Sequence, residues 1–185
     1  MYRNTFLSVM FLACCFNGSL CAQGDAQIYE RTCDAKTYPF SDPSPVATPN
    51  NSYYPYFRFD GFSMQAQEKQ WKMVVLENDY VKLTVTPEIG GKIWGAIDKV
   101  NNKEFVYTNG VVKFRDVAMR GPWTSGGIEF NFGIIGHAPT CSTPIDYLTK
   151  KNVDGSVSCH IFSYEWITRT VWNVEINLPK DKAYF

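Results

Sequence analysis

Hydrophobic and polar positions alternate along much of the chain from residue 71 onward. Residues 80–86 predict a half-buried strand, because Val81, Leu83 and Val85 alternate with the polar residues at 82, 84 and 86. The stretch from Pro87 to Gly91 interrupts this pattern, and residues 92–98 predict the next strand. Asparagine-containing turns at 101–102 and 109–110 delimit predicted strands at 104–108 and 111–117.

Two further features of the pattern lie in the last third of the chain. Asp154-Gly155 separates residues 147–151 from 156–162 and predicts a hairpin with a type I′ turn. Residues 164–178 then alternate without a break, which predicts one long strand with Tyr164 and Trp172 on the same face. Because no helical periodicity is sustained after residue 22, the sequence predicts an all-β fold, an antiparallel β-sandwich.

The N-terminus has the pattern of an export signal. Arg3 is followed by a mostly apolar stretch at residues 6–16 and by Leu20-Cys21-Ala22, which predicts a signal peptide over residues 1–22 and a secreted or periplasmic protein. Lipid attachment at Cys14 is the alternative, and a buried N-terminal helix is a third interpretation. The apolar stretch is too short to cross a bilayer, so no transmembrane segment is expected.

Residues 23–52 contain four prolines, at positions 39, 43, 45 and 49. Because proline cannot donate to a sheet ladder, this segment is expected to be an extended leader or linker without regular ladders. Residues 53–185 then form the sandwich domain. An aromatic run at 53–59 opens that domain and is interpreted as core packing or as a docking surface.

Composition narrows the possible functions. Lys plus Arg equals Asp plus Glu at 18 each, so the chain has no net field that would attract nucleic acid, and no nucleic-acid partner is expected. Outside the signal, the cysteines are Cys33, Cys141 and Cys159, which allow one disulfide and one free thiol but fit no zinc spacing. Cys159 is expected in the core of a strand. The glycine pattern fits neither a phosphate loop nor a dinucleotide site, so no cofactor is expected, and no histidine spacing suggests a metal.

Residues 119–137 carry the candidate chemistry, because they combine five glycines with several polar and aromatic side chains. The candidate substrate-binding residues are Arg120, Trp123, Glu129, Asn131 and His137. Arginine donates forked hydrogen bonds, tryptophan offers a flat face to a sugar ring, and glutamate and histidine are also weak candidates for acid–base catalysis. The alternatives are a structural ion pair between Arg120 and Glu129 and a core position for Trp123. His160, in a predicted strand, is interpreted as structural.

The residues 77–93, with the turn Pro87-Glu88-Ile89-Gly90-Gly91-Lys92, are similar to the opening of galactose mutarotase-like (aldose 1-epimerase superfamily) domains. Residues 119–137 resemble the signature of a secreted bacterial branch known only as a domain of unknown function, whose members often carry tetratricopeptide repeats. The resemblance covers about residues 53–185. It implies the N-terminal portion of a supersandwich with a sugar pocket on a concave face.

In active epimerases of this superfamily a histidine and a C-terminal glutamate catalyse ring opening. His137 corresponds loosely to the histidine, and the glutamate position would lie beyond Phe185, so the chain is expected to be truncated and inactive alone. An open sheet edge near Tyr184 predicts self-association. We therefore expect a carbohydrate-binding protein or the N-terminal part of a sugar-active enzyme, an epimerase or a glycosidase. The alternative is a structural or interaction module of the cell envelope.

Overall fold

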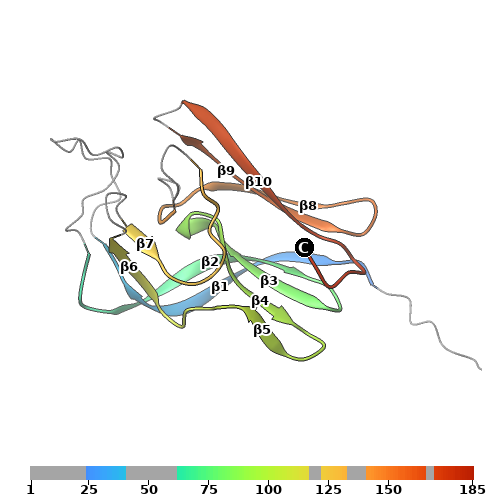
Figure 1. Ribbon diagram of the computed structural model, residues 1–185, viewed down its shortest axis with the longest axis horizontal. Coiled ribbons are helices and arrows are strands. Elements are labelled where there is room, and N and C mark those ends of the chain that lie inside the picture. Colours follow the sequence, from blue (N-terminus) through green and yellow to red (C-terminus); the bar gives the residue numbers. More distant parts are fainter. Residues whose placement is uncertain (1–23, 41–61, 117–121, 133–140, 166–168) are drawn as a thin grey trace, which may run out of the picture.

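The computed structural model describes residues 24–40, 62–116, 122–132, 141–165 and 169–185, and within these the chain forms two β-sheets packed face to face (Figure 1). The only helical element described is a single 3₁₀ turn. The prediction of an all-β sandwich is therefore confirmed. The aromatic run at 53–59 lies outside the described residues.

The larger sheet has the strand order β5-β4-β3-β2-β1-β6-β7, and the smaller has the order β10-β9-β8. Neighbouring strands are antiparallel except for β1 and β6, which pair in parallel over two residues. The bounds of the elements are β1 Gln27–Tyr38, β2 Gln67–Glu77, β3 Val81–Thr86, η1 Pro87–Ile89, β4 Lys92–Asp98, β5 Lys103–Val106, β6 Val112–Asp116, β7 Pro122–Thr124, β8 Asp146–Lys151, β9 Val157–Glu165 and β10 Thr170–Leu178.

The central hairpins follow the predicted pattern closely. β3 and β4 match the strands expected at 80–86 and 92–98, and η1 with Gly90 and Gly91 forms the break between them. Both glycines have positive φ, 66° and 69°, which only glycine adopts without a steric penalty. β5 and β6 lie within the stretches expected at 104–108 and 111–117, apart from one additional residue at the start of β5.

The expectation that residues 23–52 form no regular ladder is wrong for β1. This strand pairs with β2 over eleven residues, from Gln27 opposite Glu77 to Thr37 opposite Gln67. All four prolines follow Tyr38, so none of them removes a donor from the ladder. Residues 27–38 are therefore part of the larger sheet.

The predicted hairpin at Asp154-Gly155 is confirmed, but its turn type is wrong. Gly155 has φ of 83°, whereas Asp154 does not have the positive φ that a type I′ turn requires at both central residues. Gly155 N donates to Asn152 O (3.1 Å), and Asn152 N donates to Ser156 O (2.9 Å). The loop is therefore longer than a two-residue turn and is closed by a left-handed glycine.

The prediction of one long strand over residues 164–178 is also wrong. β10 pairs back antiparallel on β9, with Thr170 opposite Glu165, so the chain reverses between these two residues; Arg169, just before β10, has φ of 57°. Four residues, an even number, separate the two strands, so hydrophobic and polar positions keep alternating in the sequence. The core-facing positions nevertheless change from odd numbers in β9 to even numbers in β10. Tyr164 is consequently exposed opposite Val171, and it lies on the other face from buried Trp172.

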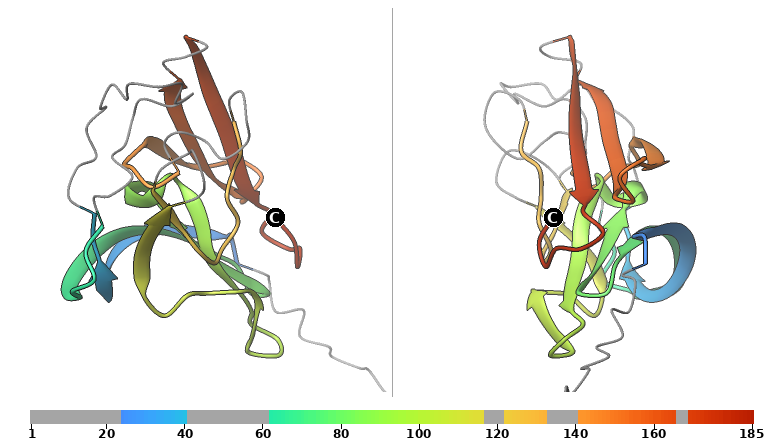
Figure 2. Two further views of the ribbon diagram at one scale, coloured as in Figure 1. Left: turned by 60° about the vertical axis from the view of Figure 1, so that its left-hand side comes forward. Right: turned by 90° about the vertical axis from the view of Figure 1, so that its right-hand side faces the viewer.

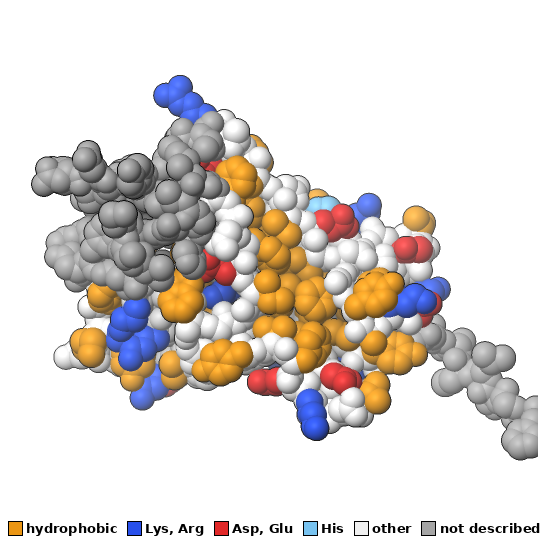
Figure 3. All heavy atoms as spheres, in the orientation of Figure 1, with side chains coloured by type: hydrophobic (Ala, Val, Ile, Leu, Met, Phe, Trp, Pro, Cys, Tyr) orange, Lys and Arg blue, Asp and Glu red, His pale blue; other side chains and the backbone are white. Residues whose placement is uncertain are grey.

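The main core lies between the two sheets. Its buried residues include Val74, Leu76, Leu83, Val85, Ile93 and Ala96 from the larger sheet and Val157, Cys159, Ile161, Trp172, Ile176 and Leu178 from the smaller. A band of hydrophobic side chains is visible between the sheets in the space-filling view (Figure 3). The prediction that Cys159 is a core residue is confirmed. Cys33, Cys141 and Cys159 are all free thiols, so the possible disulfide among them is not formed.

A second hydrophobic cluster covers the other face of the larger sheet. It contains Trp71, Met73, Ile89, Trp94, Val112 and Phe114. The Phe40 and Phe114 rings meet edge to face at 5.1 Å, which ties the end of β1 to β6. Because β6 and β7 continue the larger sheet beyond β1, this face curls into a concave surface (Figure 2).

The residues after Leu178 form no strand and instead dock on the larger sheet. Asn78 is the main contact: its Nδ2 donates to Pro179 O (2.7 Å) and Lys182 O (2.8 Å), and its Oδ1 accepts from the amides of Tyr80 and Val81. β10 has no partner strand on its outer side among the described residues. The expectation of self-association stays a prediction.

Candidate functional site

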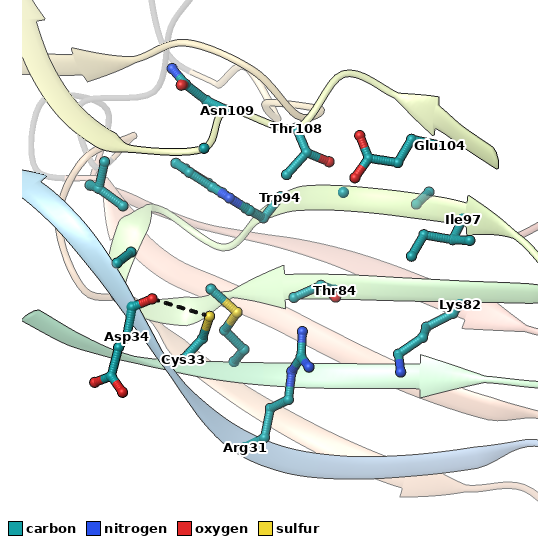
Figure 4. A pocket seen from close by; sticks show the side chains of 16 residues that line it. Arg31, Cys33, Asp34, Lys82, Thr84, Trp94, Ile97, Glu104, Thr108 and Asn109 are labelled. Carbon is teal, nitrogen blue, oxygen red and sulfur yellow. Dashed lines mark hydrogen bonds between the residues drawn. The ribbon is translucent and has the colours of Figure 1, made fainter. Parts of the chain in front are cut away.

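A cavity of about 250 Å³ opens on the concave face of the larger sheet, on the side away from the smaller sheet (Figure 4). Its lining residues come from β1, β2, β3, β4, β5, β6 and the segment 108–110. In the sheet order β1 and β5 are separated by three strands, so the sheet must curl for both to line one cavity. We refer to it as the β1–β5 cavity.

The wall formed by β4 and its neighbours is largely apolar. Trp94, Met73 and Val112 line it, and Trp94 leaves only 7% of its surface exposed. Gly95, the next residue, allows the opposite rim to approach, because a Cβ at this position would lie 2.4 Å from Thr108 Oγ1. Trp94 therefore lines the cavity with only a small part of its side chain.

Polar side chains line the cavity from two opposite sides. Arg31 of β1 extends across β2 toward Thr84 of β3, while the Glu104 carboxylate of β5 is directed toward Thr108 (Figure 4). The carboxylate of Asp34 is directed away from the cavity. Arg31 and Glu104 make no hydrogen bond or ion pair with the residues that the structure describes, so both can interact with a ligand.

Lys82 also lines the cavity and forms an ion pair with Glu77, with 3.5 Å between Lys82 Nζ and Glu77 Oε2. Glu77 further contacts Lys99 at 2.8 Å and accepts a hydrogen bond from the Tyr29 hydroxyl at 3.0 Å. Burial alone would raise the pKa of Glu77, but the hydrogen bonds of Lys99 and Tyr29 and the charges of Lys82 and Lys99 outweigh it, and the pKa is lowered. Lys82 is therefore a second cation of the lining, and its ion-pair partner Glu77 lies outside the lining.

Lys92 forms a separate buried polar centre beside the cavity. The residue is 2% exposed, and its Nζ donates to Thr124 O (2.8 Å) and Thr124 Oγ1 (3.2 Å). The ammonium lies 5.9 Å from the Trp94 ring and 5.8 Å from the Trp123 ring, within cation–π range of both. Burial lowers the pKa of Lys92, and the charges of Glu129 and Cys141 oppose this shift.

Two of the five predicted site residues belong to this Lys92 centre. Trp123 is half-buried against the lysine, and Glu129 interacts with it electrostatically. Asn131 is exposed. Arg120 and His137 lie outside the described residues, so the expected grouping of all five stays a prediction. None of Trp123, Glu129 and Asn131 is among the residues lining the β1–β5 cavity.

The glycine-containing segment nevertheless supports the cavity rim. Asn109 Nδ2 donates to Ser125 Oγ (2.6 Å), and Gly127 N donates to Tyr107 O (2.8 Å). Gly127 has φ of 72°, and a Cβ there would lie 2.2 Å from the carbonyl oxygen of Ile93. The segment 122–132 thus lies between β4 and residues 107–109 and holds the latter over the cavity.

The sequence reasoning did not identify the residues of the β1–β5 cavity. Arg31 lies in the segment interpreted as a leader, and Thr84, Trp94 and Glu104 lie on three different predicted strands. One pattern in the sequence does indicate this cavity: Gly95 follows Trp94 within a predicted strand. A glycine inside a strand indicates that another segment approaches closely, here next to a large aromatic ring.

The described residues contain no group of three or more His, Cys, Asp or Glu side chains able to hold a metal ion. His160 is partly exposed in β9, 3.7 Å from Glu175 Oε1, which agrees with a structural position. Among the residues described, no helix is long and apolar enough to cross a membrane.

Residues 48–185, most of the chain, match a family described as "Domain of unknown function (DUF5107)". Among solved structures, the chain is similar to a TPR-domain containing protein from Parabacteroides distasonis, with 25% identity and a TM-score of 0.73. The match covers 86% of this chain and 28% of that chain, so this chain spans less than a third of that protein's length. Both results agree with the resemblance to a branch known as a domain of unknown function. The wider resemblance to galactose mutarotase-like domains stays a prediction.

Proposed function

We propose that this chain, which belongs to the family described as a domain of unknown function (DUF5107), binds a carbohydrate. The family assigns no activity, so the proposal rests on the cavity itself. The observation that carries the proposal is the arrangement of the β1–β5 cavity. An apolar wall that includes Trp94 lies between Arg31 on one side and Glu104 on the other. A sugar ring presents the complementary surface, an apolar C–H face edged by hydroxyl groups.

The size of the cavity supports a single sugar ring. Pockets for drug-sized ligands span about 300–1,000 Å³, and a cavity of about 250 Å³ lies just below that range. Thr84, Thr108 and Asn109 add hydroxyl and amide groups that both donate and accept hydrogen bonds. These groups suit a polyhydroxylated ligand better than an apolar one.

The proposal is for binding rather than for a reaction. Glycoside hydrolysis requires two carboxyl groups on opposite sides of the scissile bond, about 5–10 Å apart. Of the carboxylates lining the described cavity, Glu104 is directed toward it and Asp34 away from it (Figure 4). Isothermal titration with a panel of monosaccharides tests binding directly.

The test uses purified full-length protein and a matched pair of variants. Glu104→Gln keeps the shape of the side chain but removes its charge, and should weaken sugar binding about tenfold, the effect of losing a hydrogen bond to a charged group. Lys150→Gln, on the exposed side of the smaller sheet, should leave binding unchanged. If no sugar binds, or if Glu104→Gln binds as the wild type does, the proposal is wrong. A module for protein interactions would then be the better explanation.

A further inference from the structure

We infer that the β1–β5 cavity selects an acidic sugar, a uronic acid, with Arg31 as the specificity-determining residue. This inference rests on the proposed carbohydrate function and deepens it, because it names the class of sugar. The arguments are the unpaired guanidinium group of Arg31, the second cation of the lining, Lys82, and the position of the Glu104 carboxylate on a different strand.

The guanidinium group of Arg31 is available to a ligand. Cross-strand pairing places Arg31 opposite Met73, whose thioether carries no charge. The side chain reaches across β2 toward Thr84 on the floor of the cavity (Figure 4). Arg31 makes no ion pair or hydrogen bond with any residue that the structure describes. A guanidinium facing a partly enclosed cavity gains most from an anionic partner, because a planar carboxylate matches its two parallel N–H donors.

The charges around Arg31 favour an anion further. Lys82 and Lys99 both contact the single carboxylate of Glu77, at 3.5 and 2.8 Å. Of the charged side chains that line the cavity, Arg31 and Lys82 are cationic and Asp34 and Glu104 are carboxylates, and the carboxylate of Asp34 is directed away from the cavity (Figure 4). Because Glu77 is already engaged by two lysines and by the Tyr29 hydroxyl, it is poorly placed to neutralise Arg31 as well.

The opposite wall carries the group that distinguishes a sugar acid from a simple anion. Glu104 lies on β5, with three strands between it and β1 in the order β5-β4-β3-β2-β1. A carboxylate on that wall repels an anion but accepts hydrogen bonds from hydroxyl groups. The ligand that satisfies both walls has a carboxylate at one end and hydroxyl groups at the other, which is the structure of a uronic acid.

The experiment compares galacturonate, its methyl ester and galactose by isothermal titration with the full-length protein. The ester keeps the shape of the acid and lacks its charge. We expect galacturonate to bind at least tenfold more tightly than either neutral sugar, and to weaken as salt is raised. In Arg31→Gln this preference should fall to within about twofold, and in Arg31→Lys part of it should remain, because lysine keeps the charge without the fork. Lys150→Gln should keep the full preference.

The outcomes separate the inference from the proposed function. Equal binding of all three sugars contradicts the acidic preference and leaves the carbohydrate function standing. An acidic preference that persists in Arg31→Gln removes the assignment to Arg31. Absence of binding by every sugar overturns the inference and the proposed function together. A sulfated galactose that binds more tightly than galacturonate contradicts the choice of a carboxylate. Thermal melting of each variant confirms that it is folded.

Discussion

Replacement of Lys92 by methionine is predicted to destabilise the protein by about 3 kcal/mol or more. Methionine fills a similar volume but carries neither charge nor donor. The substitution leaves the carbonyl and hydroxyl of Thr124 without the ammonium that lies 2.8 and 3.2 Å away, and it leaves Glu129 without its neighbouring cation.

The magnitude follows from the burial of the residue. Lys92 is 2% exposed, so water does not replace the lost hydrogen bonds. Removing one partner from a buried charged pair costs about 3–5 kcal/mol, although the substitution also removes the desolvation penalty of the lysine itself. We therefore expect the lower end of that range. Against a typical total stability of about 5–15 kcal/mol, the loss is large.

Urea denaturation of the full-length protein, followed by tryptophan fluorescence, measures this loss. With a denaturant slope of about 2 kcal/mol/M, a loss of 3 kcal/mol lowers the midpoint by about 1.5 M. The matched control is Lys150→Met, an exposed lysine on β8, which should change stability by no more than about 0.5 kcal/mol. Equal midpoints for Lys92→Met and Lys150→Met would refute the reasoning that the ammonium holds Thr124.

Three further predictions concern stability and use the same denaturation assay. Gly127→Ala should cost more than about 1 kcal/mol, because φ is 72° and the new Cβ meets a β4 carbonyl oxygen at 2.2 Å, whereas Gly110→Ala, with open space around it, should be nearly neutral. Asn78→Asp keeps the acceptor but loses both donors to the C-terminal segment, and should cost about 1–3 kcal/mol; stability equal to the wild type would show that these contacts contribute nothing. Burial raises the pKa of the Cys141 and Cys159 thiols from 9.0 to about 12. As pH rises above 9, the thiols of the unfolded chain therefore lose their protons before those of the folded chain. The free energy of unfolding should then fall by about 1 kcal/mol per thiol per pH unit. Cys159→Ala should make this decline shallower, and an unchanged slope would contradict the assignment.

Local patterns were sufficient for the elements whose determinants are local. β3 and β4 could be predicted because alternation, a proline and two glycines mark both strands and the break between them. β1 could not be predicted from the proline content of residues 23–52, because all four prolines follow Tyr38 and leave residues 27–38 free to form a strand. The reversal between β9 and β10 was missed because a period of two continues unchanged across an even number of intervening residues.

The cavity could not be predicted because it depends on the curl of the larger sheet. Arg31 and Glu104 lie 73 positions apart in the numbering and on strands with three others between them. No pattern within one strand records that these strands curve around a common space. The glycine-containing segment was recognised as unusual, and the structure gives its described part a supporting role at the cavity rim, through Asn109 and Ser125.

The most direct test of carbohydrate binding is a crystal structure of the protein grown with galacturonate. The account predicts a single sugar ring in the β1–β5 cavity, with its carboxylate on Arg31, its hydroxyl groups on Glu104 and its apolar face against Trp94. A sugar bound elsewhere on the molecule, with this cavity holding only water, would contradict it.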